Sequence, residues 1–425
     1  MTDTSARNSP SAPVGEEPRA VAARQRLERL DGFLRHDPAN NALLIDAFET
    51  ALSCADWVRA RHYLDQGRTQ QVEPLAWRLR EGDFWLAQES YDEAKDVLEG
   101  LMDVSEPPPG FADVLLHNLA YIEFRQGRYA ACAQRLGATL EAPQTSARDA
   151  DGQLSVTARA LQQVWLRALH HDGQFERAMA WTERAERESA LDAQAAGIAS
   201  LIAIDAADFS AAQLWSTMSL QDASSTGPCV EALVTQASLA LAAQDAQGAA
   251  RFADAALQRQ PGDGRAWSTR GFAALLASEL TIAADAFGRA LAVMGQHVGT
   301  WHGLGWTRIL QGDLTGAQSS FATALELDRN FAESHGGLAV VYALLAERQK
   351  AQVHAETALR LDRSNLSGRY AQALLSGEMK DPADVLRFAR RLLGDRAGAF
   401  GNRMADALPS VDVATPPPLD DGKEP

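Results

Sequence analysis

A repeat of about 34 residues constrains the fold of this 425-residue chain more than any other feature. Trp267, Trp301 and His335 are equally spaced at this period, and six such columns stay in phase through the second half of the chain. The other five columns hold small or apolar residues: Gly271, Gly305 and Ala339; Ala283, Ala317 and Ala351; Phe287, Phe321 and Ala355; Ala290, Ala324 and Ala358; Leu291, Leu325 and Leu359. A repeat of this length buries its apolar face only against its neighbours, so the period predicts a stack of similar units.

The pattern inside one repeat predicts two helices joined by a tight turn. In residues 298–331, the small side chains of Gly305 and Ala317 would let two helices approach closely, while Trp301 and Phe321 fill the space between them. Glycine followed by aspartate at 312–313 marks the turn. Four such repeats follow one another without interruption, at 230–263, 264–297, 298–331 and 332–365.

The first half of the chain keeps the turn but not the full pattern. A polar turn followed by an aromatic residue and then alanine occurs five times, beginning at Asp56, Ser90, Gly127, Gly173 and Asp208. We expect each of these turns to start the second helix of a pair. Counting back from them predicts repeats near 41–74, 75–108, 113–146, 159–192 and 193–226. A divergent, acidic array at 41–226 would then precede a consensus-like array at 230–365, with about nine repeats in all.

The two ends complete the predicted organisation. Residues 21–40 are expected to form an N-terminal capping helix, and 366–407 a degraded repeat and C-terminal cap of the kind that a solenoid needs. The segments 1–20 and 408–425 are predicted to be disordered tails, the second of them acidic, because they hold too few apolar residues to fold alone. Loops are predicted where the period is interrupted, at 107–110, 144–155 and 224–228.

The consensus-like repeats resemble those of the tetratricopeptide repeat (TPR) family. The resemblance is carried by the pattern Trp-x2-Leu-Gly, Gly-Asp and Ala-x3-Phe-x2-Ala-Leu, which reads Trp301, Leu304, Gly305, Gly312, Asp313, Ala317, Phe321, Ala324 and Leu325. It implies an all-α fold, a right-handed α-solenoid of about nine helix pairs with terminal capping helices. It also implies that a protein or peptide partner binds on the concave face.

In that family the concave face is lined by the second, fifth, ninth, twelfth and thirteenth positions of the first helix. In the late repeats these positions predict an apolar, aromatic strip of partner-binding residues: Phe272, Leu275, His302, Trp306, Ile309 and Val340, with Leu276, Leu310 and Leu344 at the thirteenth positions. In the middle repeats they predict a mixed, partly basic patch: Tyr121, Arg125, Arg167 and His170. The first two repeats offer Glu49 and Asp83. We expect Trp306 to be the main anchor, because it is a large aromatic residue outside the packing columns.

Charge argues against nucleic acid and anionic lipid as partners. The chain has 40 basic and 56 acidic residues and a formal net charge of −16, and both of those ligands need a basic surface. The excess of acid is concentrated in 41–229, which holds 15 basic and 28 acidic residues. No run of 18 apolar residues occurs, so no membrane span is expected.

The three cysteines, Cys54, Cys132 and Cys229, are odd in number and far apart, which suits neither a disulfide framework nor a metal site. They favour a reducing, cytoplasmic location. The sequence also lacks a phosphate-binding Gly-x4-Gly-Lys loop, a His-Glu-x2-His motif and a Cys-x2-Cys motif. We therefore expect no enzymatic activity, no metal and no cofactor.

The leading hypothesis is a non-enzymatic scaffold or adaptor, or a chaperone-like assembly factor similar in repeat type to the small chaperones of bacterial secretion systems. Two alternatives stay open. The chain could be the recognition or regulatory subunit of a separate enzyme such as a transferase. It could also be a structural protein that associates with itself into homo-oligomers.

Overall fold

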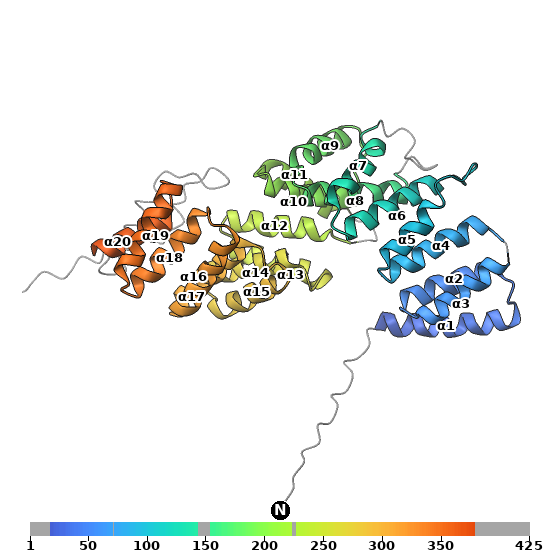
Figure 1. Ribbon diagram of the computed structural model, residues 1–425, viewed down its shortest axis with the longest axis horizontal. Helices are drawn as coiled ribbons and strands as arrows, with labels where there is room; N and C mark the ends of the chain where they lie inside the picture. Colours follow the sequence, from blue (N-terminus) through green and yellow to red (C-terminus); the bar gives the residue numbers. More distant parts are fainter. Residues whose placement is uncertain (1–17, 71, 143–153, 223–226, 379–425) are drawn as a thin grey trace, which may run out of the picture. The chain divides into compact units, whose positions relative to one another are not determined.

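The computed structural model of the chain describes residues 18–70, 72–142, 154–222 and 227–378 (Figure 1). These residues form twenty α-helices and no β-strand. The prediction of an all-α helical-repeat solenoid is confirmed. The expectations for 1–17, for the loop segments 143–153 and 223–226, and for 379–425 lie outside the described residues.

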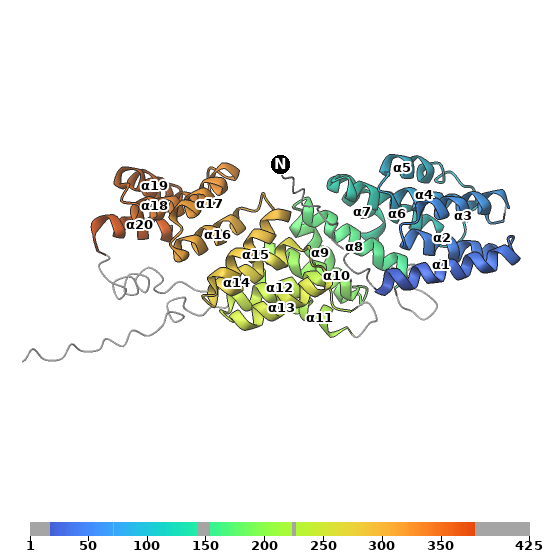
Figure 2. The same ribbon diagram turned by 90° about the horizontal axis from the view of Figure 1, so that it is seen from below.

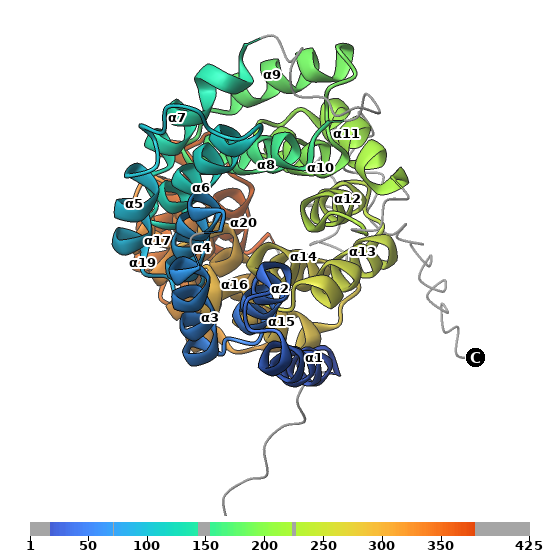
Figure 3. The same cartoon turned by 90° about the vertical axis from the view of Figure 1, so that its right-hand side faces the viewer.

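The chain divides into two compact units, unit 1 up to Gln174 and unit 2 from Phe175 onward. This division falls inside the segment 41–226. In unit 1, α1 packs against α2, and each later helix packs against the next (Figure 3). The helices of unit 1 are α1 (Pro18–His36), α2 (Asn41–Ser53), α3 (Trp57–Thr69), α4 (Pro74–Ala87), α5 (Tyr91–Glu99), α6 (Phe111–Arg125), α7 (Tyr129–Leu140) and α8 (Val156–His171).

Unit 2 repeats the same helix-pair arrangement with greater regularity. Each pair packs against the next, and α20 packs against both α18 and α19 (Figure 2). Its helices are α9 (Phe175–Arg187), α10 (Ala193–Asp205), α11 (Phe209–Gln221), α12 (Val230–Ala242), α13 (Ala246–Arg259), α14 (Gly264–Leu276), α15 (Leu280–Val293), α16 (Val298–Gln311), α17 (Leu314–Leu327), α18 (Ala332–Leu344), α19 (Arg348–Leu361) and α20 (Leu366–Ser376).

The five turns recognised in the divergent half each precede a second helix, as predicted. The helices begin at the aromatic residue of each motif, namely Trp57, Tyr91, Tyr129, Phe175 and Phe209. Two of the turns show why the helix starts there, because an aspartate side chain accepts a hydrogen bond from a backbone N–H group that has no partner inside the helix. Asp56 accepts from Arg59 N at 3.1 Å, and Asp208 accepts from Ala211 N at 3.0 Å.

A left-handed residue ends the turn between the first and second helix of a pair. Nine of the described residues at equivalent places have positive φ, from 54° to 80°: Ala55, Glu89, Gly127, Gly173, Ala207, Gln244, Ser278, Gly312 and Ala346. Glycine occupies this place in three of these turns, and only the turn at 312–313 has the Gly-Asp sequence. The turns without glycine place a side chain in a conformation that costs an L-residue about 1–2 kcal/mol.

Two aromatic rings in the core of unit 2 lie clamped between glycines. Phe287 of α15 lies between Gly271 of its own pair and Gly303 of the next. A Cβ atom on Gly271 would come within 2.7 Å of the ring, and one on Gly303 within 2.5 Å. The same clamp recurs one repeat later with Phe321, Gly305 and Gly337. The glycine columns are therefore set by close helix contact, as the repeat predicted.

The tryptophan column is less buried than the sequence indicated. Trp267 and Trp301 were expected to fill the core, but both side chains are only partly buried. The indole Nε1 of Trp301 donates to the carbonyl of Gly295 at 2.8 Å, and Nε1 of Trp267 donates to the carbonyl of Pro261 at the same distance. These residues therefore tie each first helix to the loop before it, in addition to packing.

Candidate functional site

The apolar strip predicted in the late repeats lies on three neighbouring first helices, α14, α16 and α18. Phe272 and Leu275 of α14 are partly exposed and pack around the cluster centred on Phe287. Trp306 and Ile309 of α16 are also partly exposed. We call these four residues, Phe272, Leu275, Trp306 and Ile309, the late strip.

Trp306 packs against the core and is also partly exposed. Its ring meets Phe321 edge-to-face, with 5.7 Å between the ring centroids and an interplanar angle of 77°. It also packs against the clusters that include Leu338 and Ala339 of α18. The structure therefore leaves only part of the predicted anchor open to a partner.

His302 and Val340 do not belong to the accessible surface, which corrects the sequence prediction. His302 is 9% exposed, and its Nε2 lies 2.9 Å from Oγ of Ser334 on the neighbouring first helix. Burial lowers the pKa of His302 to about 4. Val340 is 0% exposed. The family positions project these side chains toward the groove, but the adjacent repeat covers them.

The most exposed apolar residues of the three helices are leucines at their C-terminal ends. Leu276, Leu310 and Leu344 are 44%, 60% and 42% exposed and lie one repeat period apart. Each lies one helical turn after a ninth-position residue such as Trp306, and so continues the same helix face. We call these three residues the leucine row.

The comparison with protein families decides what these repeats are. The model of the family "Tetratricopeptide repeat" matches residues 298–331, which hold α16 and α17. The clamp of Phe and Gly recurs in α14 and α15, and the same turn conformation recurs in the pairs on both sides. Residues 298–331 are a tetratricopeptide repeat, and the rest of the described chain is built from similar helix pairs. Repeats of this class are interaction modules, so the chain is in general terms a protein-interaction scaffold.

Solved structures that are similar to parts of this chain include the following three. YrrB, a TPR protein with an unusual peptide-binding site, is 19% identical, with 46% of this chain and 98% of that chain covered and a TM-score of 0.35. A thermophilic TPR protein of Thermus thermophilus is 18% identical, with 44% and 100% covered and a TM-score of 0.36. The Thermobaculum terrenum O-GlcNAc transferase is 25% identical, with 31% and 26% covered and a TM-score of 0.29.

All three TM-scores are below 0.5. The match to the transferase spans about a quarter of that enzyme's chain. Comparison with curated protein sequences found no match.

In the predicted patch of the middle repeats, Arg125 and Tyr121 make contacts within unit 1. Arg125 of α6 donates to the hydroxyl of Tyr121 at 2.8 Å and to Oε1 of Glu89 at 2.6 Å. Its guanidinium also lies 5.7 Å from the ring centre of Tyr91. The other two predicted residues, Arg167 and His170, lie on α8, which packs beside α6. Arg167 and His170 are both partly exposed.

A polar chain that the sequence did not reveal connects α4 with α6. Nδ2 of Asn118 donates to Oδ1 of Asp83 at 3.0 Å, and Oδ1 of Asn118 lies 3.0 Å from Nδ1 of His117. Burial raises the pKa of Asp83 to about 6, although Arg80 and the Asn118 hydrogen bond act in the opposite direction. The available signal was a single asparagine among the apolar residues of the sixth helix, which is too common to indicate a network by itself.

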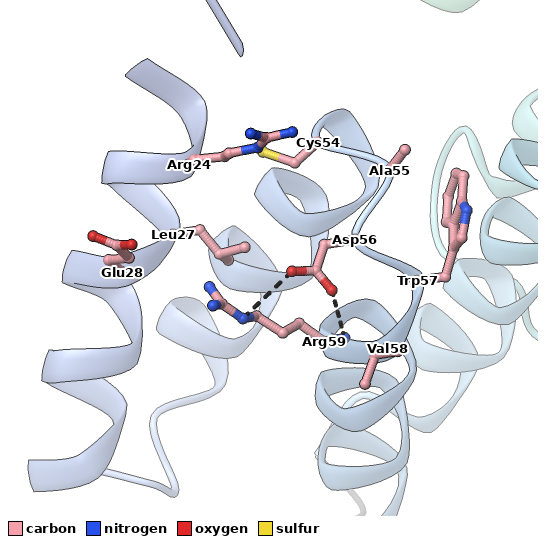
Figure 4. Close-up of a pocket in the computed structure, with 9 residues that line it drawn as sticks. All are labelled: Arg24, Leu27, Glu28, Cys54, Ala55, Asp56, Trp57, Val58 and Arg59. Atoms are coloured by element: carbon pink, nitrogen blue, oxygen red, sulfur yellow. Dashed lines mark hydrogen bonds and ion pairs between the residues drawn. The ribbon is translucent and has the colours of Figure 1, made fainter. Parts of the chain in front are cut away.

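A pocket of about 460 Å³ lies between α1 and the turn from α2 to α3 (Figure 4). Arg24 and Leu27 line it from α1, and Cys54 and Asp56 line it from the turn. Asp56 is engaged with Arg59, accepting from its backbone N–H group and forming an ion pair of 3.4 Å with its guanidinium. The Asp56 carboxylate in this pocket is therefore already paired within the protein.

The described residues hold no group of three or more His, Cys, Asp or Glu side chains placed to bind a metal ion. Cys54, Cys132 and Cys229 are free thiols. Burial raises the pKa of Cys132 to about 12, which keeps it protonated and unreactive at neutral pH. No helix within the described ranges is both long and apolar enough for a membrane span.

Proposed function

We propose that this TPR protein is a non-enzymatic scaffold that binds a segment of a partner protein on α14, α16 and α18, through the late strip and the leucine row. The observation that carries the proposal is that these apolar side chains stay partly or largely exposed after the repeats have packed. A contiguous apolar surface of this kind is typical of a protein-binding site.

Packing also supports the choice of face. The first helices present their ends and one side to solvent, while the second helices supply the clamped rings such as Phe287 and Phe321. Partner side chains would therefore meet a rigid surface whose side chains are already held by the core. A rigid, preorganised surface loses less conformational entropy on binding.

Site-specific photo-cross-linking in the native host tests this proposal. A photoreactive amino acid replaces Ile309 in the late strip or, as a control, Val353, which is 57% exposed on the second helix α19. We expect one or a few defined protein adducts from position 309 and none of them from position 353. Adducts formed only at position 353, or equally at both, would contradict the proposed face.

We propose that the chain acts in a reducing cytoplasm, consistent with its free thiols, and that any catalysis belongs to the partner. Identification of the cross-linked protein distinguishes an enzyme subunit, an assembly client and a second copy of this chain.

A further inference from the structure

A row of acidic residues runs beside the leucine row. Each residue of this acid row is the N-cap of a second helix, and the spacing is again one repeat period: Asp245, Glu279, Asp313 and Glu347. Each leucine of the leucine row precedes an acid by three positions, as Leu310 precedes Asp313. The two rows therefore follow the same edge of unit 2, where the first helix of each pair turns into the second.

The charges on this edge are only partly balanced. Glu279 and Asp313 have no ion pair with any residue in the described part of the chain. Arg308 is the basic residue nearest to Asp313 in sequence, and it donates instead to the carbonyl of Gly316 and to Oγ of Ser320, both at 2.9 Å. Lys350 pairs with Glu347 at 2.5 Å, and Arg348 is exposed beside them. The edge at Glu279 and Asp313 is therefore acidic.

The spacing of the leucine row suits a helical partner. Packed helices lie about 8–10 Å apart, and two turns of an α-helix rise about 10.8 Å. A partner helix with an apolar residue every seven positions can therefore place one side chain on each of Leu276, Leu310 and Leu344. Basic residues one turn away would then face the acid row.

We propose that this edge of unit 2 docks a basic amphipathic helix, with apolar side chains on the leucine row and Lys or Arg side chains against the acid row. The inference rests on the proposed function and adds the class of partner to it. Exposed leucines alone would accept any apolar segment. The adjacent carboxylates at Glu279 and Asp313 favour a cationic one over an anionic one, because like charges at an interface are costly.

Three synthetic peptides test the partner class against the full chain by fluorescence anisotropy. The first is a helix with leucine at every seventh position and lysine elsewhere on that face. The second replaces the lysines with glutamate, and the third keeps the lysines but replaces the leucines with serine. We expect the first to bind at least tenfold more tightly than either of the others, with affinity falling as salt is raised. Equal binding of the first and second peptides, or of the first and third, would overturn the proposal.

Matched variants locate the binding. Leu310→Ser should weaken binding of the leucine–lysine peptide at least fivefold, whereas Leu361→Ser should leave it unchanged. Leu361 is 43% exposed but lies at the end of α19, at the opposite edge of its repeat. Glu279→Gln combined with Asp313→Asn should weaken binding and reduce its salt dependence, and an asparagine side chain can still cap α17. An equal loss in Leu310→Ser and Leu361→Ser would overturn the proposed location.

Self-association is the competing use of this edge. Sedimentation velocity of the wild type and of Leu310→Ser examines it, and a wild-type oligomer that Leu310→Ser dissociates would replace the peptide proposal with a homo-oligomer interface. The cross-linking result at position 309 stays informative in either case. If defined adducts form there while the leucine–lysine peptide does not bind, the proposed function stands and only the partner class is wrong.

Discussion

The ring of Phe321 lies so close to Gly305 that a Cβ atom on this glycine would sit 2.7 Å from Cζ of the ring. The two residues come from the two helices of one repeat. Gly337 of the next repeat approaches the same ring, where an added Cβ would sit 2.5 Å from Cδ1 and Cε1. One aromatic ring thus fixes the distance between helices both within a repeat and between repeats.

Enlarging Gly305 should separate these helices. We expect Gly305→Leu to lower the free energy of unfolding of unit 2 by about 1–3 kcal/mol, the usual range for overpacking a core. Urea denaturation of the full chain, followed by circular dichroism, measures the effect. Gly288→Ala is the matched control, since a Cβ there meets no atom within 4 Å. It should raise stability by about 0.5–1 kcal/mol, as glycine disfavours a helix interior. If the urea transition of Gly305→Leu matched that of the wild type, the close contact between Gly305 and Phe321 would not restrict the size of residue 305.

The left-handed turn residues give a second prediction. Ala346 has φ of 60° in the turn before α19, so Ala346→Gly should relieve strain and raise the free energy of unfolding by up to about 1 kcal/mol. The gain is smaller than the full strain because glycine also loses more entropy on folding. Gly312→Ala tests the reverse change in the equivalent turn, where φ is 80° and a Cβ would meet no atom within 4 Å. It should cost about 1 kcal/mol. The two variants shifting the melting temperature in the same direction would contradict this account.

The buried His302 should make stability depend on pH. Its pKa falls to about 4 in the folded protein from an ordinary value of 6.5, so the folded state disfavours protonation. The contribution of His302 is therefore present above pH 6.5 and is lost as pH falls toward 4. Between pH 7 and pH 5 this loss amounts to about 2 kcal/mol.

His302→Gln isolates that contribution, because its amide reaches the position of Nε2 and can bond to Ser334 but does not titrate in this range. We expect the difference in unfolding free energy between wild type and variant to change by about 2 kcal/mol from pH 7 to pH 5, in favour of the variant at low pH. A difference that is constant over this interval would show that His302 is not a buried neutral imidazole. All other titrating groups are common to both proteins.

Asp83 should show the opposite sign. Folding raises its pKa from 3.8 to about 6, so its contribution is favourable below pH 3.8 and is lost as pH rises through 6. We expect Asp83→Asn to raise the free energy of unfolding by about 1–2 kcal/mol at pH 7, after allowance for partial solvent screening. The gain should be smaller at pH 4. The amide oxygen of the variant can accept from Asn118 as the carboxylate does, and a gain independent of pH would contradict the assignment.

The repeat architecture of unit 2 follows from the sequence alone. The constant period and the columns of alanine and glycine specify which faces must meet, because each repeat contacts only its neighbours. The motifs at Asp56, Ser90, Gly127, Gly173 and Asp208 also located the second helices of the divergent half. An aromatic residue after a polar turn is local information, and helix starts are decided locally by capping.

Tertiary structure decided which of the candidate residues are accessible. The family positions treat one helix at a time and place His302, Trp306 and Val340 on a common groove. In the folded chain, Ser334 and its helix cover His302, α18 packs on Trp306, and Val340 is completely buried. The leucine row stays exposed because it lies beyond the contact between neighbouring first helices. Whether a side chain on these helices is buried therefore depends on the neighbouring repeat and not on its own residue type.

The same distinction holds for polar groups. The sequence predicts that Asp313 lies in a turn. Whether a basic residue neutralises its charge depends on the direction of the Arg308 side chain. Asp83, Asn118 and His117 form one chain only because α4 and α6 bring them together. The sequence by itself determined the helices, their order and their packing columns, since these arise from local propensity and short-range repetition. Side-chain burial, ion pairing and pKa depend on contacts between repeats, and only the tertiary structure sets them.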